Sequence, residues 1–176
     1  MFVLRNGSLV LLVLGAALAL SVINAVVQAP GARAAAARPV IDAVERREVA
    51  LINSYRRSHG LRALKVDLKL SRAATWMSQD MARGHYFAHT DRQGRSPYGR
   101  MAVFGYPSNS WRGENLAAAI GPPKLAFRAW RNSPEHNANM LDPHFRAIGV
   151  SRVYSASSVY GWYWTTDFGS TVTRTI

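Results

Sequence analysis

The sequence predicts an α+β domain in which helices pack on a small antiparallel sheet. Helical spacing of apolar residues dominates the chain as far as residue 141, whereas β-branched and aromatic residues are concentrated after Pro143. Two such stretches, "RAIGVSRVY" (146–154) and "VYGWYWTTDFG" (159–169), flank the short polar segment "SASS" and predict a β-hairpin. Helices that come first, followed by strands, are typical of the α+β class.

The first two helices have clear start and stop signals. Asp42 can cap a helix that runs to about Ser58, with Gly60 just beyond its end. Asp67 can cap a second helix over about 68–83. Apolar residues recur at helical spacing in both segments, so each helix should turn one face toward a core.

Three shorter helices and one further strand should follow. Ser96 predicts the start of a short helix, with Pro97 at its first position. The stretch "PPKLAFRAWRN" (122–132) predicts a fourth helix, and Ser133 should cap a fifth. A third strand is expected within residues 108–119, near "ENLAAAI".

Length, charge and cysteine count limit the class of protein. The 176 residues are enough for one domain of ordinary size with a real core. The 22 Lys and Arg residues exceed the 10 Asp and Glu residues, which gives a net charge of +12. Such a charge favours anionic partners, although a solvated basic surface explains it equally well. With no cysteine in the chain, disulfides, cysteine-ligated zinc and a cysteine nucleophile are excluded.

The N-terminus predicts export from the cytoplasm. Residues 1–34 combine a basic start at Arg5 with the apolar span Leu9–Val27 and a small-residue stretch suited to cleavage. We favour a signal peptide over an uncleaved membrane anchor, because both the order of features and the alanine-rich end fit a signal. Residues 35–43 then form a linker and residues 44–172 the folded domain. Both interpretations place that domain in the cell envelope or outside the cell.

Histidines and glutamates supply the candidate chemistry. His85 and His89 stand four residues apart, but Gly84 should end the preceding helix, so they are expected on a loop. Glu114 precedes an apolar run and needs a partner if it is buried. His136 falls in the first turn of the fifth helix, where a neutral imidazole fits better than a cation.

Four segments follow one another along the chain: "LINSYRRSHGLRALKVDLKLSRAATWMSQDMARGHYFAHTD", "GYPSNSWRGENLA", "AWRNSPEHNANMLDPHFRAIGVS" and "GWYWTTDFG". In this order they resemble the bacterial, cysteine-free branch of the CAP superfamily, which is also called SCP-like. The resemblance covers about residues 45–170. It implies an α-β-α sandwich, which adds a third layer to the fold predicted from residue patterns. It also implies a central cleft that carries two histidines and two glutamates.

The resemblance places the cleft at four positions of this chain. His89 and His136 match the two histidines, and Glu114 matches the first glutamate. Ser133 stands where many relatives have the second glutamate. His89, Glu114 and His136 are compatible with Zn²⁺ or another divalent cation plus water, but the missing carboxylate should make metal binding weak or absent. Three roles stay open for the cleft: ligand or metal binding, a purely structural network, and catalysis.

The predicted function is that of a secreted or envelope-attached CAP-domain protein, monomeric, that binds a lipid, an anionic cell-wall polymer or a protein. Binding would use the cleft and the basic surface. The alternative is a hydrolase in which a metal-bound water at the same cleft acts as nucleophile. Nucleic acid is disfavoured as a partner, because no nucleic-acid-binding motif is present and the chain is expected to be exported.

Overall fold

The computed structural model describes residues 40–176. The predicted signal peptide or anchor (1–34) and the first part of the predicted linker lie outside these residues. Within the described part of the chain, no helix has the length and apolar character needed to cross a membrane.

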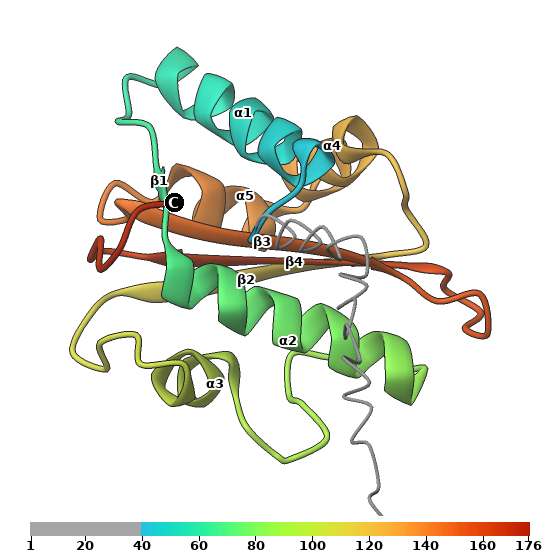
Figure 1. Cartoon of the computed structure of the whole chain (residues 1–176). Coiled ribbons are helices and arrows are strands. Elements are labelled where there is room, and N and C mark those ends of the chain that lie inside the picture. Colours follow the sequence, from blue (N-terminus) through green and yellow to red (C-terminus); the bar gives the residue numbers. More distant parts are fainter. Residues whose placement is uncertain (1–39) are drawn as a thin grey trace, which may run out of the picture. The chain divides into compact units, whose positions relative to one another are not determined.

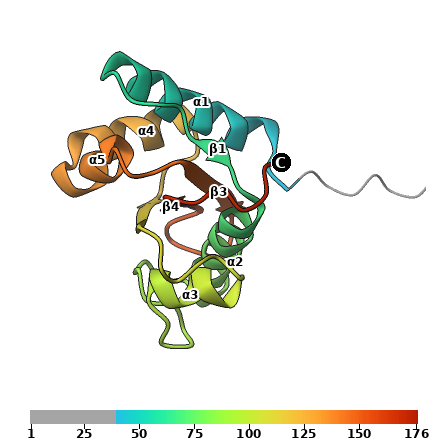
Figure 2. The ribbon, with the colours of Figure 1, turned by 90° about the vertical axis from the view of Figure 1, so that its left-hand side faces the viewer.

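The described residues form three layers, with a sheet between two layers of helices (Figure 1). The prediction of an α-β-α sandwich is therefore confirmed. One face of the sheet carries α1 (Ala43–Ser58), α4 (Pro123–Asn132) and α5 (Pro134–Leu141). The other face carries α2 (Leu68–Gly84) and α3 (Pro97–Val103), as the rotated view also shows (Figure 2).

The sheet has four strands in the described residues, in the order β1-β3-β4-β2. The predicted hairpin is formed by β3 (Ala147–Tyr154) and β4 (Trp162–Gly169), and the predicted third strand is β2 (Arg112–Ala118). The prediction of an antiparallel sheet needs a correction, because β1 (Lys65–Val66) pairs parallel with β3 and makes the sheet mixed. A strand of two residues is too short to show the alternation that reveals a strand in a sequence.

Side-chain caps start the two long helices as predicted. Asp42 accepts hydrogen bonds from the backbone N–H groups of Val44 and Glu45, each at 2.8 Å, and Glu45 completes a capping box. Asp67 caps α2 through the N–H of Lys69, at 2.9 Å. Ser133 occupies the cap position of α5, but its side chain makes no capping hydrogen bond, so that part of the prediction is wrong.

Packing extends beyond both predicted ends of the domain. Ile41, which was placed in the linker, is 1% exposed and belongs to the main core. Near the C-terminus, the buried carboxylate of Asp67 accepts hydrogen bonds from the backbone N–H groups of Thr173 (2.6 Å) and Arg174 (2.9 Å). The cap of α2 therefore also fixes the end of the chain.

Alternation along β2 sends neighbouring side chains to opposite faces of the sheet. Glu114 lies opposite Asp167 of β4, which in turn lies opposite Gly149 of β3. A Cβ atom on Gly149 would come within 2.1 Å of the backbone of Leu70, so this row faces α2. Asn115 points the other way and contacts α5. Because β2 is an edge strand, groups from both helix layers can meet along its outer side.

Candidate functional site

The structure brings three of the four predicted site residues to one cleft at the outer edge of β2. His89 reaches it from the loop after α2, Glu114 from β2, and His136 from α5. The cleft has a volume of about 260 Å³. Its other lining residues are Pro97, Tyr98, Gly113, Glu135 and Asn139.

His89 and Glu114 are directly hydrogen-bonded. The Nδ1 atom of His89 lies 2.7 Å from Oε1 of Glu114, with the histidine side chain 51% exposed and the glutamate side chain 1% exposed. The loop that carries His89 is held by Asp80, which accepts hydrogen bonds from the hydroxyl of Tyr86 (2.6 Å) and the guanidinium of Arg92 (2.9 Å). Burial raises the pKa of Asp80, but the hydrogen bonds from Arg92 and Tyr86 and the charge of Arg92 together outweigh it and lower the pKa overall. The exposed imidazole of His89 is therefore held in place by the buried carboxylate of Glu114.

Arg100 of α3 completes this network, and the sequence analysis did not identify it. Its side chain is fully buried, and its guanidinium forms an ion pair with the second oxygen of Glu114. The same guanidinium lies 3.8 Å from the carboxylate of Asp91 and donates to the backbone carbonyl of His89 at 3.3 Å. A helical arginine is normally solvated, so no pattern in the sequence signals that this one is buried.

Asp167 lies beneath the network and was also not identified from the sequence. It is 0% exposed, and no donor in the described residues reaches either carboxyl oxygen. Burial, followed by the nearby charge of Glu114, raises its pKa well above the ordinary value, although Arg100 acts in the opposite direction. Burial and the neighbouring carboxylate therefore favour the protonated form of Asp167.

His136 differs from His89 because its ring makes no hydrogen bond within residues 40–176. Burial, followed by the proximity of His89, lowers its pKa, and Glu135 opposes this shift. The imidazole is consequently neutral at neutral pH, as expected for the first turn of a helix. The backbone is fixed, since the Asn115 side chain donates to the His136 carbonyl at 2.9 Å. Asn139 donates in turn to the side-chain oxygen of Asn115, also at 2.9 Å.

Ser133 and His85 lie outside the cleft. Ser133 is not among the residues that line the cleft. His85 ends α2 in a left-handed conformation and lies 3.1 Å from the hydroxyl of Ser157, away from the cleft. Glu135, the neighbour of His136 in the first turn of α5, is exposed and lines the cleft.

The cleft residues do not fit a divalent metal ion. Among residues 40–176, no three His, Cys, Asp or Glu side chains are grouped closely enough to hold one. Both oxygens of Glu114 are already used, one by His89 and the other by Arg100. The guanidinium therefore supplies the positive charge that a metal would otherwise bring.

A family model described as "CAP: Cysteine-rich secretory protein family" matches residues 49–168, more than half of the chain. The chain belongs to the CAP family. A curated relative, the uncharacterized protein YkwD of Bacillus subtilis, is 38% identical over 128 residues, which are 73% of this chain and 48% of that protein. The chain thus spans about half the length of this relative.

Two solved structures share the fold. An extracellular protein of Bacillus anthracis that contains an SCP domain is 27% identical, with a TM-score of 0.62 over 70% of this chain and 39% of that protein. An outer surface protein of Borrelia burgdorferi has a TM-score of 0.62 at 23% identity, over 73% of this chain and 95% of that protein. The fold predicted from the sequence resemblance is confirmed by these likenesses.

Proposed function

We propose that this CAP-domain chain is an exported protein of the cell envelope that binds a cell-wall polymer, with a polar group of the polymer seated in the cleft. Support for the location comes from the predicted signal segment and from relatives described as extracellular or outer surface proteins. Support for an anionic polymer comes from the net charge of +12.

The observation that carries this proposal is the difference in hydrogen bonding between His89 and His136. His89 is fixed in a network with Glu114 and Arg100, whereas the ring of His136 has no hydrogen-bond partner in the part of the chain that the structure describes. A neutral imidazole offers one donor and one acceptor. Together with the exposed carboxylate of Glu135, it can satisfy hydroxyl and amide groups of a ligand.

The size and polarity of the cleft favour a polar ligand over a lipid. A volume of about 260 Å³ suits one sugar or amino-acid unit better than an acyl chain. An acyl chain would also cover His136 and Glu135 without giving them hydrogen bonds, which costs free energy. Hydrolysis is not favoured, because Glu114 is engaged by Arg100 and the carboxyl group of Asp167 is buried away from solvent.

Cosedimentation with protein-free peptidoglycan sacculi tests the proposal. We expect the unchanged protein to bind and His136→Ala to raise the Kd about tenfold, the effect of one lost hydrogen bond. His85→Asn is the matched control, since it changes an exposed histidine outside the cleft, and it should leave the Kd unchanged. Binding that is indifferent to His136, or that occurs with phospholipid vesicles and not with sacculi, would show the proposal to be wrong.

A further inference from the structure

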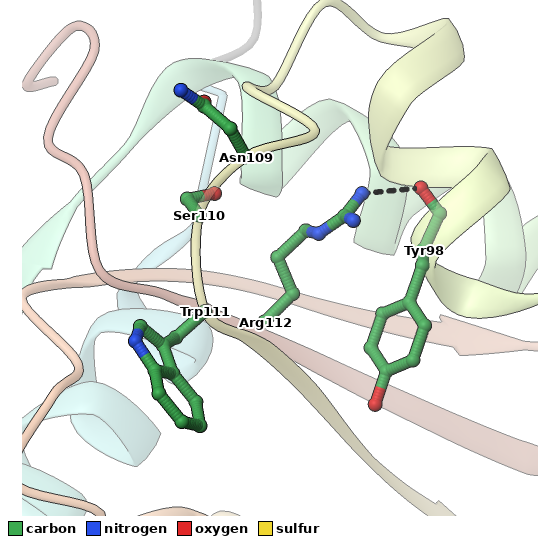
Figure 3. Close-up of a pocket in the computed structure, with 5 residues that line it drawn as sticks. All are labelled: Tyr98, Asn109, Ser110, Trp111 and Arg112. Atoms are coloured by element: carbon green, nitrogen blue, oxygen red, sulfur yellow. Dashed lines mark hydrogen bonds between the residues drawn. The ribbon is translucent and has the colours of Figure 1, made fainter.

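We propose that the pocket beside the cleft is a second binding subsite, which takes a pyranose ring of an acidic cell-wall glycan. The inference rests on the proposed function and extends it from one polar group to a chain of sugars. This pocket has a volume of about 330 Å³. Its lining residues are Tyr98, Asn109, Ser110, Trp111 and Arg112 (Figure 3).

Tyr98 connects the two sites, because it lines both the cleft and the neighbouring pocket. The cleft lies toward His136 and Glu135, and the pocket lies toward Trp111. A linear ligand that lies across Tyr98 would therefore contact both. This shared wall makes the pocket a continuation of the cleft and not a separate site.

Two aromatic rings of this pocket are held toward solvent. Trp111 is 61% exposed and Tyr98 is 50% exposed, although large aromatic side chains usually gain from burial. The Trp111 ring stacks on His144, with centroids 4.3 Å apart and an interplanar angle of 14°, and this contact favours one orientation of the ring. The Trp111 N–H donates to the Ser170 hydroxyl at 3.1 Å, and the Ser170 N–H donates to the Trp111 carbonyl at 3.0 Å, so the backbone just before β2 is held in place. Rigid exposed rings of this kind are prepared contact surfaces, since little entropy is lost on binding.

Arg112 lies between the two aromatic side chains (Figure 3). Its guanidinium donates to the backbone carbonyls of Tyr98 and Ser108, each at 2.9 Å, and lies 5.2 Å from the Tyr98 ring centroid. These bonds hold α3 against the start of β2, so Arg112 positions Tyr98. The pocket contains this cation and no acidic side chain, which suits a ligand with a carboxylate.

The chemistry of the pocket matches a sugar ring. A pyranose has a face of C–H groups, which packs on an aromatic ring, and an edge of hydroxyl groups, which needs polar partners. The rings of Trp111 and Tyr98 supply the first, and the Asn109 amide with the hydroxyl oxygen of Ser110 supplies the second. The Ser110 hydroxyl proton is already given to the Pro107 carbonyl at 2.7 Å, so its oxygen remains an acceptor. Sugars of bacterial wall glycans that carry carboxyl groups meet all of these requirements.

Isothermal titration of the folded protein with muramidase-released peptidoglycan fragments tests the inference. We expect Trp111→Ala and Tyr98→Ala each to raise the Kd about tenfold or more, and Trp111→Phe to keep most of the affinity. Tyr154→Ala is the matched control, because Tyr154 is an aromatic residue 57% exposed on the β3–β4 hairpin, and it should change the Kd less than about threefold. Chitohexaose, which lacks carboxylates, should bind more weakly than the fragments.

The outcomes separate this inference from the proposed function. Loss of binding in His136→Ala with full binding in Trp111→Ala and Tyr98→Ala would overturn the second subsite and leave the cleft proposal standing. Loss in all three variants, with Tyr154→Ala unaffected, would support both. Fragments that do not bind the unchanged protein, or that bind all variants equally, would overturn both.

Discussion

Two fully buried arginines, Arg56 and Arg100, lie on opposite sides of the sheet and are satisfied in different ways. Arg100 faces carboxylates, those of Glu114 and Asp91. Arg56 of α1 instead donates to four backbone carbonyls. These belong to Arg62 (2.9 Å), Met140 (2.7 Å), Asp142 (3.0 Å) and Phe145 (3.4 Å).

The difference shows two roles: Arg56 links segments of the chain, whereas Arg100 balances the charge of buried carboxylates. Arg56 joins α1 to the segment between α5 and β3 through neutral acceptors, and burial lowers its pKa. Arg100 neutralises acidic groups beneath the cleft, so its removal would leave charges and not only carbonyls without a partner. The comparison therefore predicts which substitutions a second change can rescue.

Replacing Arg100 should have the largest effect. Arg100→Met leaves the buried carboxylate of Glu114 without its cation, whereas Asp91 keeps its ion pair with Arg95 at 2.8 Å. The unpaired charge of Glu114 should lower the free energy of unfolding by about 3–5 kcal/mol. Adding Glu114→Gln to this variant removes one uncompensated charge and should recover part of the loss. Denaturant unfolding followed by circular dichroism at pH 7 measures both variants. A double variant no more stable than Arg100→Met would contradict the charge-balance role.

Replacing Arg56 should lower the free energy of unfolding somewhat less, and Glu114→Gln should not restore the lost stability. Arg56→Met leaves several buried carbonyls without donors, and we expect a loss of about 2–3 kcal/mol in the same unfolding experiment. Because Arg56 lies far from the acidic cluster, its effect and that of Glu114→Gln should add. Rescue of Arg56→Met by Glu114→Gln would remove the distinction between the two arginines.

Glu48 sharpens the comparison, because it is a buried ionisable group with no partner at all in the described residues. Burial raises its pKa from 4.5 to about 8. Between these two pH values the folded state keeps a proton on Glu48 that the unfolded state releases. The stability that Glu48 contributes in its protonated form is fully present below pH 4.5. Stability should then fall by about 1.4 kcal/mol for each pH unit until about pH 8.

Glu48→Gln cannot ionise and should lack this contribution to the pH dependence. Unfolding curves at several values between pH 5 and pH 8 should show the variant gaining on the unchanged protein as pH rises. Parallel pH profiles for the two proteins would mean that Glu48 is ionised in the folded state and has a partner there.

Local signals predicted the helices better than they predicted the sheet. Asp42 and Asp67 were identified as caps because a cap bonds to residues two or three positions away. The strand β1 was missed because two residues carry no period, and its parallel pairing made the sheet mixed. The same limit explains the N-terminal boundary, since one apolar residue, Ile41, does not reveal that it belongs to the core.

Some residues of the site could also be predicted from the sequence, and others could not. His89, Glu114 and His136 were found because the order of their segments resembles the CAP family, and all three line one cleft. Arg100 and Asp167 were not found, because nothing in their neighbouring residues distinguishes a buried charge from a solvated one. Ser133 was assigned to the cleft by its position in the resemblance alone, and it does not line it.

The sequence by itself determined the α+β class, the starts of the helices, the hairpin and the three residues that lead to the cleft. These features depend on contacts within a few residues or on motifs that can be read along the chain. Only the tertiary structure decided what surrounds those residues. It places a guanidinium on Glu114, a buried Asp167 with a raised pKa beside it, and a His136 ring that has no hydrogen-bond partner among residues 40–176. The reason is that desolvation and charge pairing depend on groups brought together from distant segments. Desolvation and charge pairing in turn determine which groups of the site are protonated and which can still form hydrogen bonds.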